Sequence, residues 1–213
     1  PHNPMLDADG RVWLTTRVQG VDNPAWCREG SDNSYAQYFP VDRAGRHTGY
    51  YDPNTEEFEL IHTCFGTHHL QFAEDDNDTL YFSGGGQVVG WLDTKMYDAT
   101  GDEVASQGWC PTVLDTNGDG TITKPWNEPV RRGEEAMFDS SLDTRIIAGA
   151  YGVITNPLDD AVWLVSDRYP GELVRLDPGD NPPETCISEL YTVPAEHGYR
   201  TRGLDVDRNG ILW

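Results

Sequence analysis

Four short segments of this chain repeat one pattern, in which an apolar strand is followed by a turn rich in Asp, Asn and Gly and then by a second strand. The segments are HNPMLDADGRVWLTT at 2–16, HLQFAEDDNDTLYFSG at 69–84, YGVITNPLDDAVWLVS at 151–166 and RGLDVDRNGILW at 202–213. The second strand carries an aromatic residue each time, namely Trp13, Tyr81, Trp163 and Trp213. Because the turn residues tolerate tight hairpin geometry, each segment predicts a β-hairpin.

Two further strands follow each complete hairpin, in segments 47–61, 87–106 and 171–193. Each of these segments reads as a strand, a turn that begins with Asp, and another strand. A four-stranded unit that recurs with an aromatic anchor is typical of a β-propeller blade. We therefore predict an all-β fold made of four-stranded antiparallel blades. A sandwich or a β-helix is the alternative, although a sandwich does not require the same turn at the same place in every unit.

The blade starts divide the chain into units of roughly 1–67, 68–149, 150–200 and 201–213, of which the last is incomplete. A compact blade needs about 40 to 50 residues, so the first two units carry insertions near 20–45 and 107–149. Rings of this kind close with about four to eight blades. The chain opens on PHNPML and closes on NGILW inside a strand, so we expect a partial propeller cut from a longer chain. The remaining blades would come from the rest of the same protein or from a partner chain.

The segment PHNPMLDADGRVWLTT resembles the start of a blade in the streptogramin B lyase (virginiamycin B lyase) family and in related NHL-like and SMP-30-like propellers. Blades of that family repeat proline, His or Gly, an apolar residue, Asp-x-x-Gly, an apolar residue, Trp, an apolar residue and Thr. The resemblance implies a ring of six or seven blades and, as in some members, lyase or lactonase activity. It covers four short segments, and no catalytic residue of the family can be assigned to a position in this sequence.

The formal net charge is −21, from 36 acidic and 15 basic residues. Such a surface repels phosphate backbones, so we expect no nucleic-acid partner, and it attracts cationic ligands or divalent metals. No run approaches the ~18 apolar residues of a membrane span. The four cysteines are widely spaced and predict either two disulfides or four buried thiols: Cys27, Cys64, Cys110 and Cys186. Together these features predict a secreted, extracellular or periplasmic protein.

The sequence LDTNGDGTITKPWNE at 114–128 resembles a calcium-binding loop. Asp115, Asn117 and Asp119 alternate, so that three side-chain oxygens can face one cation, and Thr121 offers its carbonyl oxygen. We predict a structural calcium ion at this loop. A metal-free turn rich in Asp and Asn is the alternative.

The loop departs from an EF-hand at its twelfth position, where Trp126 replaces the bidentate Glu. Glu128 or an acid from RRGEEAMFD at 131–139 would have to take the place of that ligand. Ile122 is expected to anchor the loop in the adjoining core. Because the loop lies in an insertion and not at a blade start, we expect its ion to be structural and not catalytic.

The first strand of each propeller blade lines the central channel. His2 and His69 occupy the same position in two successive units, and Tyr151 and Arg202 occupy it in the next two. We therefore expect these four residues to meet at the mouth of the channel. Neutral imidazoles can bind a further divalent metal such as zinc, copper or iron, or act as a general base, while Arg202 stabilises an oxyanion or carboxylate. The alternative is that these residues only bond backbone groups and channel water.

Neighbouring residues in the segment HTCFGTHH are expected to lie elsewhere. The two-residue period of a strand predicts that His68 points away from His69, so the two should not bind one ion. His62 and Cys64 end the preceding unit and are expected far from the channel. Cys64 is more readily interpreted as a disulfide partner than as a metal ligand.

The insertion VDNPAWCREGSDNSYAQYFP at 21–40 places four aromatic residues among polar ones. Such an arrangement can stack a glycan or an apolar small molecule, or it can cover the edge of its own blade. The residues are Trp26, Tyr35, Tyr38 and Phe39.

Two functions fit these features. The first is an exported enzyme, a lyase or a metal-assisted hydrolase, that uses His69, His2, Tyr151 and Arg202 as catalytic groups. The second is a non-catalytic, calcium-stabilised propeller that binds a protein partner, a glycan or a cell-surface component. Whether the chain is an enzyme stays open at this level.

Overall fold

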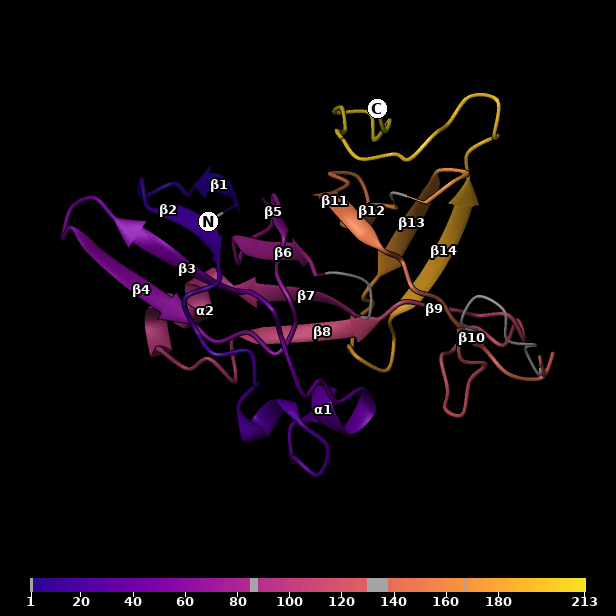
Figure 1. Ribbon diagram of the computed structural model, residues 1–213, viewed down its shortest axis with the longest axis horizontal. Coiled ribbons are helices and arrows are strands. Elements are labelled where there is room, and N and C mark those ends of the chain that lie inside the picture. The colour runs from indigo at the N-terminus through magenta and orange to yellow at the C-terminus, as the bar shows by residue number, and fades with distance from the viewer. Residues whose placement is uncertain (1, 85–87, 130–137, 167) are drawn as a thin grey trace.

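The computed structural model describes residues 2–84, 88–129, 138–166 and 168–213. These residues form an all-β protein with only short helices, built from three sheets that follow one another along the chain (Figure 1). Each sheet contains an antiparallel series of four strands in sequence order. The described residues do not form a closed ring.

The first sheet has the strand order β1-β2-β3-β4. The predicted hairpin 2–16 forms its first two strands, and the segment 47–61 forms the other two. The strands are β1 (His2–Leu6), β2 (Val12–Thr16), β3 (His47–Asp52) and β4 (Glu57–Ile61). The insertion between β2 and β3 holds the short helices η1 (Ala25–Cys27) and α1 (Ser34–Tyr38).

The second sheet repeats this order with β5-β6-β7-β8. Its strands are β5 (His69–Phe72), β6 (Thr79–Ser83), β7 (Val88–Asp93) and β8 (Gln107–Pro111). Helix α2 (Thr94–Thr100) occupies the connection where the sequence predicted only a turn that begins with Asp. The carboxylate of Asp93 accepts a hydrogen bond from the backbone N–H of Met96, which caps the start of this helix.

The third sheet has six strands in the order β10-β9-β14-β13-β12-β11. Four of them form the expected antiparallel series: β11 (Ala150–Thr155), β12 (Val162–Ser166), β13 (Glu172–Asp177) and β14 (Ile187–Thr192). The other two are β9 (Val113–Leu114) and β10 (Thr144–Arg145), and β9 runs parallel to β14. The prediction that 87–106 holds both further strands of the second unit is wrong for the second of them, because β8 lies in the segment 107–149 that was expected to be an insertion. The rest of that segment extends the outer edge of the third sheet with β9 and β10.

The chain ends in a fourth, smaller hairpin. Val206 and Leu212 form an isolated antiparallel bridge, and Asp205 and Trp213 exchange two backbone hydrogen bonds. The indole of Trp213 is 76% exposed, whereas that of Trp13, at the equivalent position of the first hairpin, is fully buried.

The first strands of the three sheets lie side by side, because β1 packs against β5 and β5 packs against β11 (Figure 1). Hydroxyl groups at the ends of the second strands join one sheet to the next. Thr15 Oγ1 lies 3.0 Å from the carbonyl oxygen of His68, and Ser83 Oγ donates a 2.6 Å hydrogen bond to the carbonyl oxygen of Tyr151. The residues that open each sheet are thus brought to one region of the molecule.

The apolar core lies between neighbouring sheets. One cluster joins the first two sheets and includes Trp13, Phe65 and Phe82, all fully buried. A second cluster joins the second and third sheets and includes Val89 and Leu164. Burying large side chains between sheets is the main favourable term that holds such layers together.

Two disulfides reinforce the fold. Cys27 bonds to Cys64 within the first unit, and Cys110 of β8 bonds to Cys186 just before β14, which ties the second sheet to the third. Of the two interpretations of the cysteines, paired disulfides are therefore the one found. Disulfides of this kind are typical of oxidising compartments outside the cytosol. Among the described residues no helix has the length and apolar character needed to cross a bilayer.

Candidate functional site

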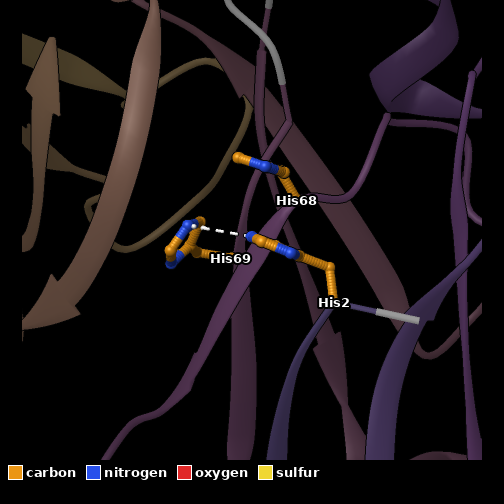
Figure 2. A group of neighbouring side chains, drawn as sticks. All are labelled: His2, His68 and His69. Atoms are coloured by element: carbon orange, nitrogen blue, oxygen red, sulfur yellow. Dashed lines mark hydrogen bonds between the residues drawn. The ribbon is translucent and has the colours of Figure 1, made fainter. Parts of the chain in front are cut away.

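Three imidazoles gather where β1 and β5 meet. The side chains of His2, His68 and His69 each offer a nitrogen, and these nitrogens all lie within 4.8 Å of one another (Figure 2). His2 Nε2 and His69 Nε2 are 3.3 Å apart. His2 opens β1 and His69 opens β5, so the common position predicted for these two residues does bring them together.

The prediction that His68 points away from the other histidines is wrong. Its ring stacks on that of His2, with centroids 4.5 Å apart and planes 5° from parallel, and it meets the ring of His69 edge-on at 4.7 Å. The two-residue alternation fails because His68 precedes the first residue of β5 and lies in the entry loop, outside the extended strand.

Local backbone features hold the cluster in place. Thr15 Oγ1 lies 3.0 Å from the carbonyl oxygens of both His2 and His68, which links the first strand to the next entry loop. Asn3 has the left-handed φ of 49° beside a register shift in β1, and its side-chain amide donates to the carbonyl oxygen of Leu70. Asn tolerates this conformation better than most residues, and a bulge of this kind re-aims the adjacent side chain, here His2.

Burial and neighbouring positive charge favour the neutral form of His68 and His69. Burial, followed by the neighbouring His69 and His2, lowers the pKa of His68 to about 4. Burial, and then His2 and Arg46, also lowers the pKa of His69. Neutral imidazoles carry the lone pairs that a metal ion requires.

The spacing of His2 and His69 fits a tetrahedral metal site. A zinc ion with Zn–N bonds of about 2.0–2.1 Å places two ligand nitrogens about 3.3–3.4 Å apart, and the observed separation of the two Nε2 atoms is 3.3 Å. The parallel rings of His2 and His68 cannot both direct lone pairs at one ion, since each lone pair lies in its own ring plane. Coordination by all three residues therefore requires the ring of His68 to turn.

Tyr151 and Arg202 continue the line of residues that begin successive units. The ring of Tyr151 lies 4.7 Å from that of His69 and 5.0 Å from that of His68. The guanidinium carbon of Arg202 lies 4.9 Å from the centre of the Tyr151 ring. The four residues predicted at the channel mouth therefore form a row in space, in which each one contacts the next in chain order. His68 joins this row although the sequence did not place it there.

The remaining members of the HTCFGTHH segment lie apart from the cluster. His62 Nδ1 is 3.6 Å from a carboxylate oxygen of Glu103, and Cys64 is bonded to Cys27. His47, the first residue of β3, is buried, and its nitrogens lie 3.0 Å and 3.2 Å from the carbonyl oxygens of Gly20 and Thr63.

The predicted calcium loop is closed by its own side chains. Asp115 accepts hydrogen bonds from the backbone N–H groups of Gly118 and Gly120, at 2.7 Å and 2.8 Å. Asn117 Oδ1 accepts from the N–H of Asp119, and Asp119 Oδ1 accepts from that of Thr121. Each carboxylate still has lone pairs that face solvent, so this hydrogen bonding fits both a calcium site and a metal-free turn.

The flank of the loop is anchored as the sequence predicted. Ile122 and Trp126 are buried and pack with Val113 of β9. Glu128 accepts from the indole N–H of Trp126 and pairs with Arg145, so both of its oxygens have a partner within the protein. Of the segment RRGEEAMFD, residues 131–137 lie outside the described residues.

The aromatic residues of the 21–40 insertion cover their own part of the core. Trp26, Tyr35 and Phe39 are partly buried and pack against the cluster between the first two sheets. Tyr38 packs beside Trp126, and Lys124 lies 5.3 Å from the centre of the Tyr38 ring. Phe39 also lines an open pocket together with Lys124 and Trp126. These contacts fit both interpretations, a cover for the blade and a surface on which a ligand can stack.

Two residues near the cluster were not singled out from the sequence. They are Arg17 and Arg46, whose charges, after burial and the other two histidines, lower the pKa of His68. Arg17 directly follows β2 and Arg46 directly precedes β3. No local pattern in the sequence marks these two arginines, which lie at the two ends of the connection between β2 and β3.

Comparisons with protein-family models, with curated proteins and with solved structures found no match. The resemblance to the streptogramin B lyases thus stays a resemblance of short segments. The assignment of function rests on the geometry of the site.

Proposed function

We propose that this protein binds a divalent transition metal through His2, His68 and His69 and uses it in a lyase or hydrolase reaction. The observation that supports this most strongly is the gathering of three imidazole nitrogens within 4.8 Å. Imidazole is a ligand for zinc, copper, iron and nickel, and three protein ligands leave a coordination position open for substrate.

We also propose that the sheets are blades of a larger, propeller-like ring. Three successive four-stranded antiparallel sheets whose first strands lie side by side support this arrangement. In this proposal the remaining blades, for a ring of six or seven, come from elsewhere in the protein or from a partner chain. The streptogramin-lyase-like repeat and the two disulfides agree with an exported protein of this kind.

Each group of the site has a distinct role in this proposal. A bound divalent metal polarises a carbonyl or phosphoryl oxygen and lowers the pKa of bound water. The Tyr151 ring, in contact with His69 and His68, forms one wall of the site. Arg202 lies beyond it and stabilises a developing oxyanion or carboxylate.

Zinc binding tests this function. Equilibrium dialysis should find one zinc ion per chain in the unaltered protein and a loss of that ion in His69→Ala. His62→Ala is the matched control, because His62 lies beside Glu103 and outside the cluster. Hydrolysis of p-nitrophenyl esters should follow the zinc content. Equal zinc binding by both variants would contradict the proposal.

A second candidate is a non-catalytic protein that is stabilised by calcium and binds a protein partner, a glycan or a cell-surface component. The alternating oxygens of Asp115, Asn117 and Asp119, with the carbonyl of Thr121, favour it. The strongly acidic surface agrees with it equally well.

Calcium has its own test. Chelation with EGTA should lower the melting temperature, and Asp115→Ala should remove that sensitivity. Asp9→Ala serves as the control, since Asp9 is an exposed carboxylate in a different turn. A melting temperature that does not respond to EGTA in the unaltered protein would show that the loop is only a turn.

A further inference from the structure

A hollow of about 260 Å³ opens beside the imidazole of His68. Three connections meet there: both ends of the connection from β2 to β3, the loop that leads into β5 and the start of the chain that leaves β6. The lining residues are Arg17, Gly45, Arg46, Gly66, Thr67, His68 and Gly84. The hollow therefore shares His68 with the three-histidine cluster.

The hollow is positively charged in a protein of net charge −21. Arg17, Arg46 and His68 line it, and none of its described lining residues carries a carboxylate. Elsewhere Arg11, Arg145 and Arg175 form ion pairs of 2.6–2.7 Å with carboxylates. Within the part of the chain that the structure describes, Arg17 and Arg46 have no such partner. Two like charges that face one space repel each other unless an anion lies between them.

Three glycines belong to the lining of the hollow. A Cβ at Gly66 would lie 2.6 Å from the carbonyl oxygen of Gly84, and one at Gly84 would lie 2.0 Å from that of Gly66, so these two backbones are closely packed. A Cβ at Gly45 would meet no atom within 4 Å, and the space on that side is free.

We propose that Arg17, Arg46 and His68 bind an oxyanion, the carboxylate or phosphate group of the substrate, next to the three-histidine cluster. Guanidinium groups match both kinds of anion with parallel hydrogen bonds. The hollow is smaller than the ~300–1,000 Å³ of sites for drug-sized ligands, so it holds the charged end of a small molecule. This assignment rests on the proposed function, because it names the substrate class for the same site.

Isothermal titration calorimetry with inorganic phosphate and with acetate tests the assignment. The full chain is used with calcium present, once loaded with zinc and once treated with 1,10-phenanthroline, which removes transition metals and leaves calcium. One anion should bind per chain, and Arg46→Gln should weaken binding at least tenfold. Arg208→Gln is the control, because it removes the same charge from an exposed residue of the C-terminal hairpin. This variant should bind the anion as tightly as the unaltered protein. The stronger of the two probes identifies the phosphate or the carboxylate as the group recognised.

Gly45→Val provides a second variant, because it fills the hollow without removing charge. It should weaken anion binding while zinc stoichiometry stays the same. No saturable binding of either anion, or equal losses in Arg46→Gln and Arg208→Gln, would overturn the anion site whether or not zinc binds. If the phenanthroline-treated protein binds the anion and loses that binding in Arg46→Gln, the result would support the anion site even if the protein binds no zinc. Each proposal can therefore fail without the other.

Discussion

The turns of three of the four hairpins show how single side chains encode the repeat. Asp7 Oδ1 accepts from the N–H of Arg11, and Asp207 Oδ1 accepts from that of Ile211, each four residues further on. Asp75 Oδ1 does the same for Thr79. An Asp that closes a tight turn in this way competes well with water for the backbone N–H groups. The Asp-rich turns of the sequence therefore predicted the hairpins reliably.

Other features at this scale had no signal in one sequence. The stacking of His68 on His2 depends on a loop conformation that the period of a strand does not describe. The convergence of Arg17 and Arg46 on one hollow depends on three connections that are far apart in the chain. Sequence position alone could place His2 and His69 together, because both begin a hairpin of the same kind.

His47 gives a prediction about pH. Burial, its largest influence, lowers the pKa of His47 in the folded protein, whereas the unfolded residue titrates near about 6.5. The unfolded state therefore binds more protons below that pH, and the free energy of unfolding should fall as pH falls from about 6.5. His47→Gln should reduce this slope, while His68 and His69, whose pKa values are also lowered, still contribute to it.

Urea unfolding curves measured between pH 7.5 and pH 5 check this prediction. His197→Gln is the control, since His197 is exposed. An identical slope in His47→Gln and in the unaltered protein would contradict it.

The four-stranded series of each unit could be expected from the sequence. The strands at the outer edge of the third sheet and helix α2 could not. Hairpins and the two strands that follow recur with clear turn residues, and all three units form four-stranded series. The pairing of β9 with β14 involves a strand of only two residues and a distant partner, so no local pattern indicates it. Helix α2 arises because Asp93 caps a stretch that was expected to be a turn.

The contact between Gly66 and Gly84 gives a prediction for the entry into the second sheet. Gly66→Ala would place a methyl group 2.6 Å from a backbone oxygen, which the backbone must move to accommodate. We expect a loss of about 1–3 kcal/mol in the free energy of unfolding. Gly45→Ala, which meets no atom within 4 Å, should change it by less than about 0.5 kcal/mol.

Guanidinium chloride unfolding compares these two variants directly. Equal stability of Gly66→Ala and Gly45→Ala would show that the entry loop does not require the close approach of the two backbones. If Gly45→Ala lowered the free energy of unfolding more than Gly66→Ala does, the result would contradict the packing described at both positions.

At the scale of the whole molecule, the site is a property of neighbouring sheets and not of one segment. His2 belongs to the first sheet and His69 to the second, while Tyr151 belongs to the third. Apolar clusters between the sheets and the bond between Cys110 and Cys186 hold these parts together. A metal ion bound by His2 and His69 would therefore stabilise the contact between two sheets in addition to serving any reaction.

Cobalt(II) absorption spectroscopy tests this central claim most directly, because four-coordinate cobalt gives strong visible bands that follow its ligands. We predict one equivalent of cobalt per chain with such bands, displaced by zinc. His2→Ala and His69→Ala should each abolish the bands although the two residues lie in different sheets, while His62→Ala should retain them. Absence of the bands in the unaltered protein, or their survival in both His2→Ala and His69→Ala, would contradict the account.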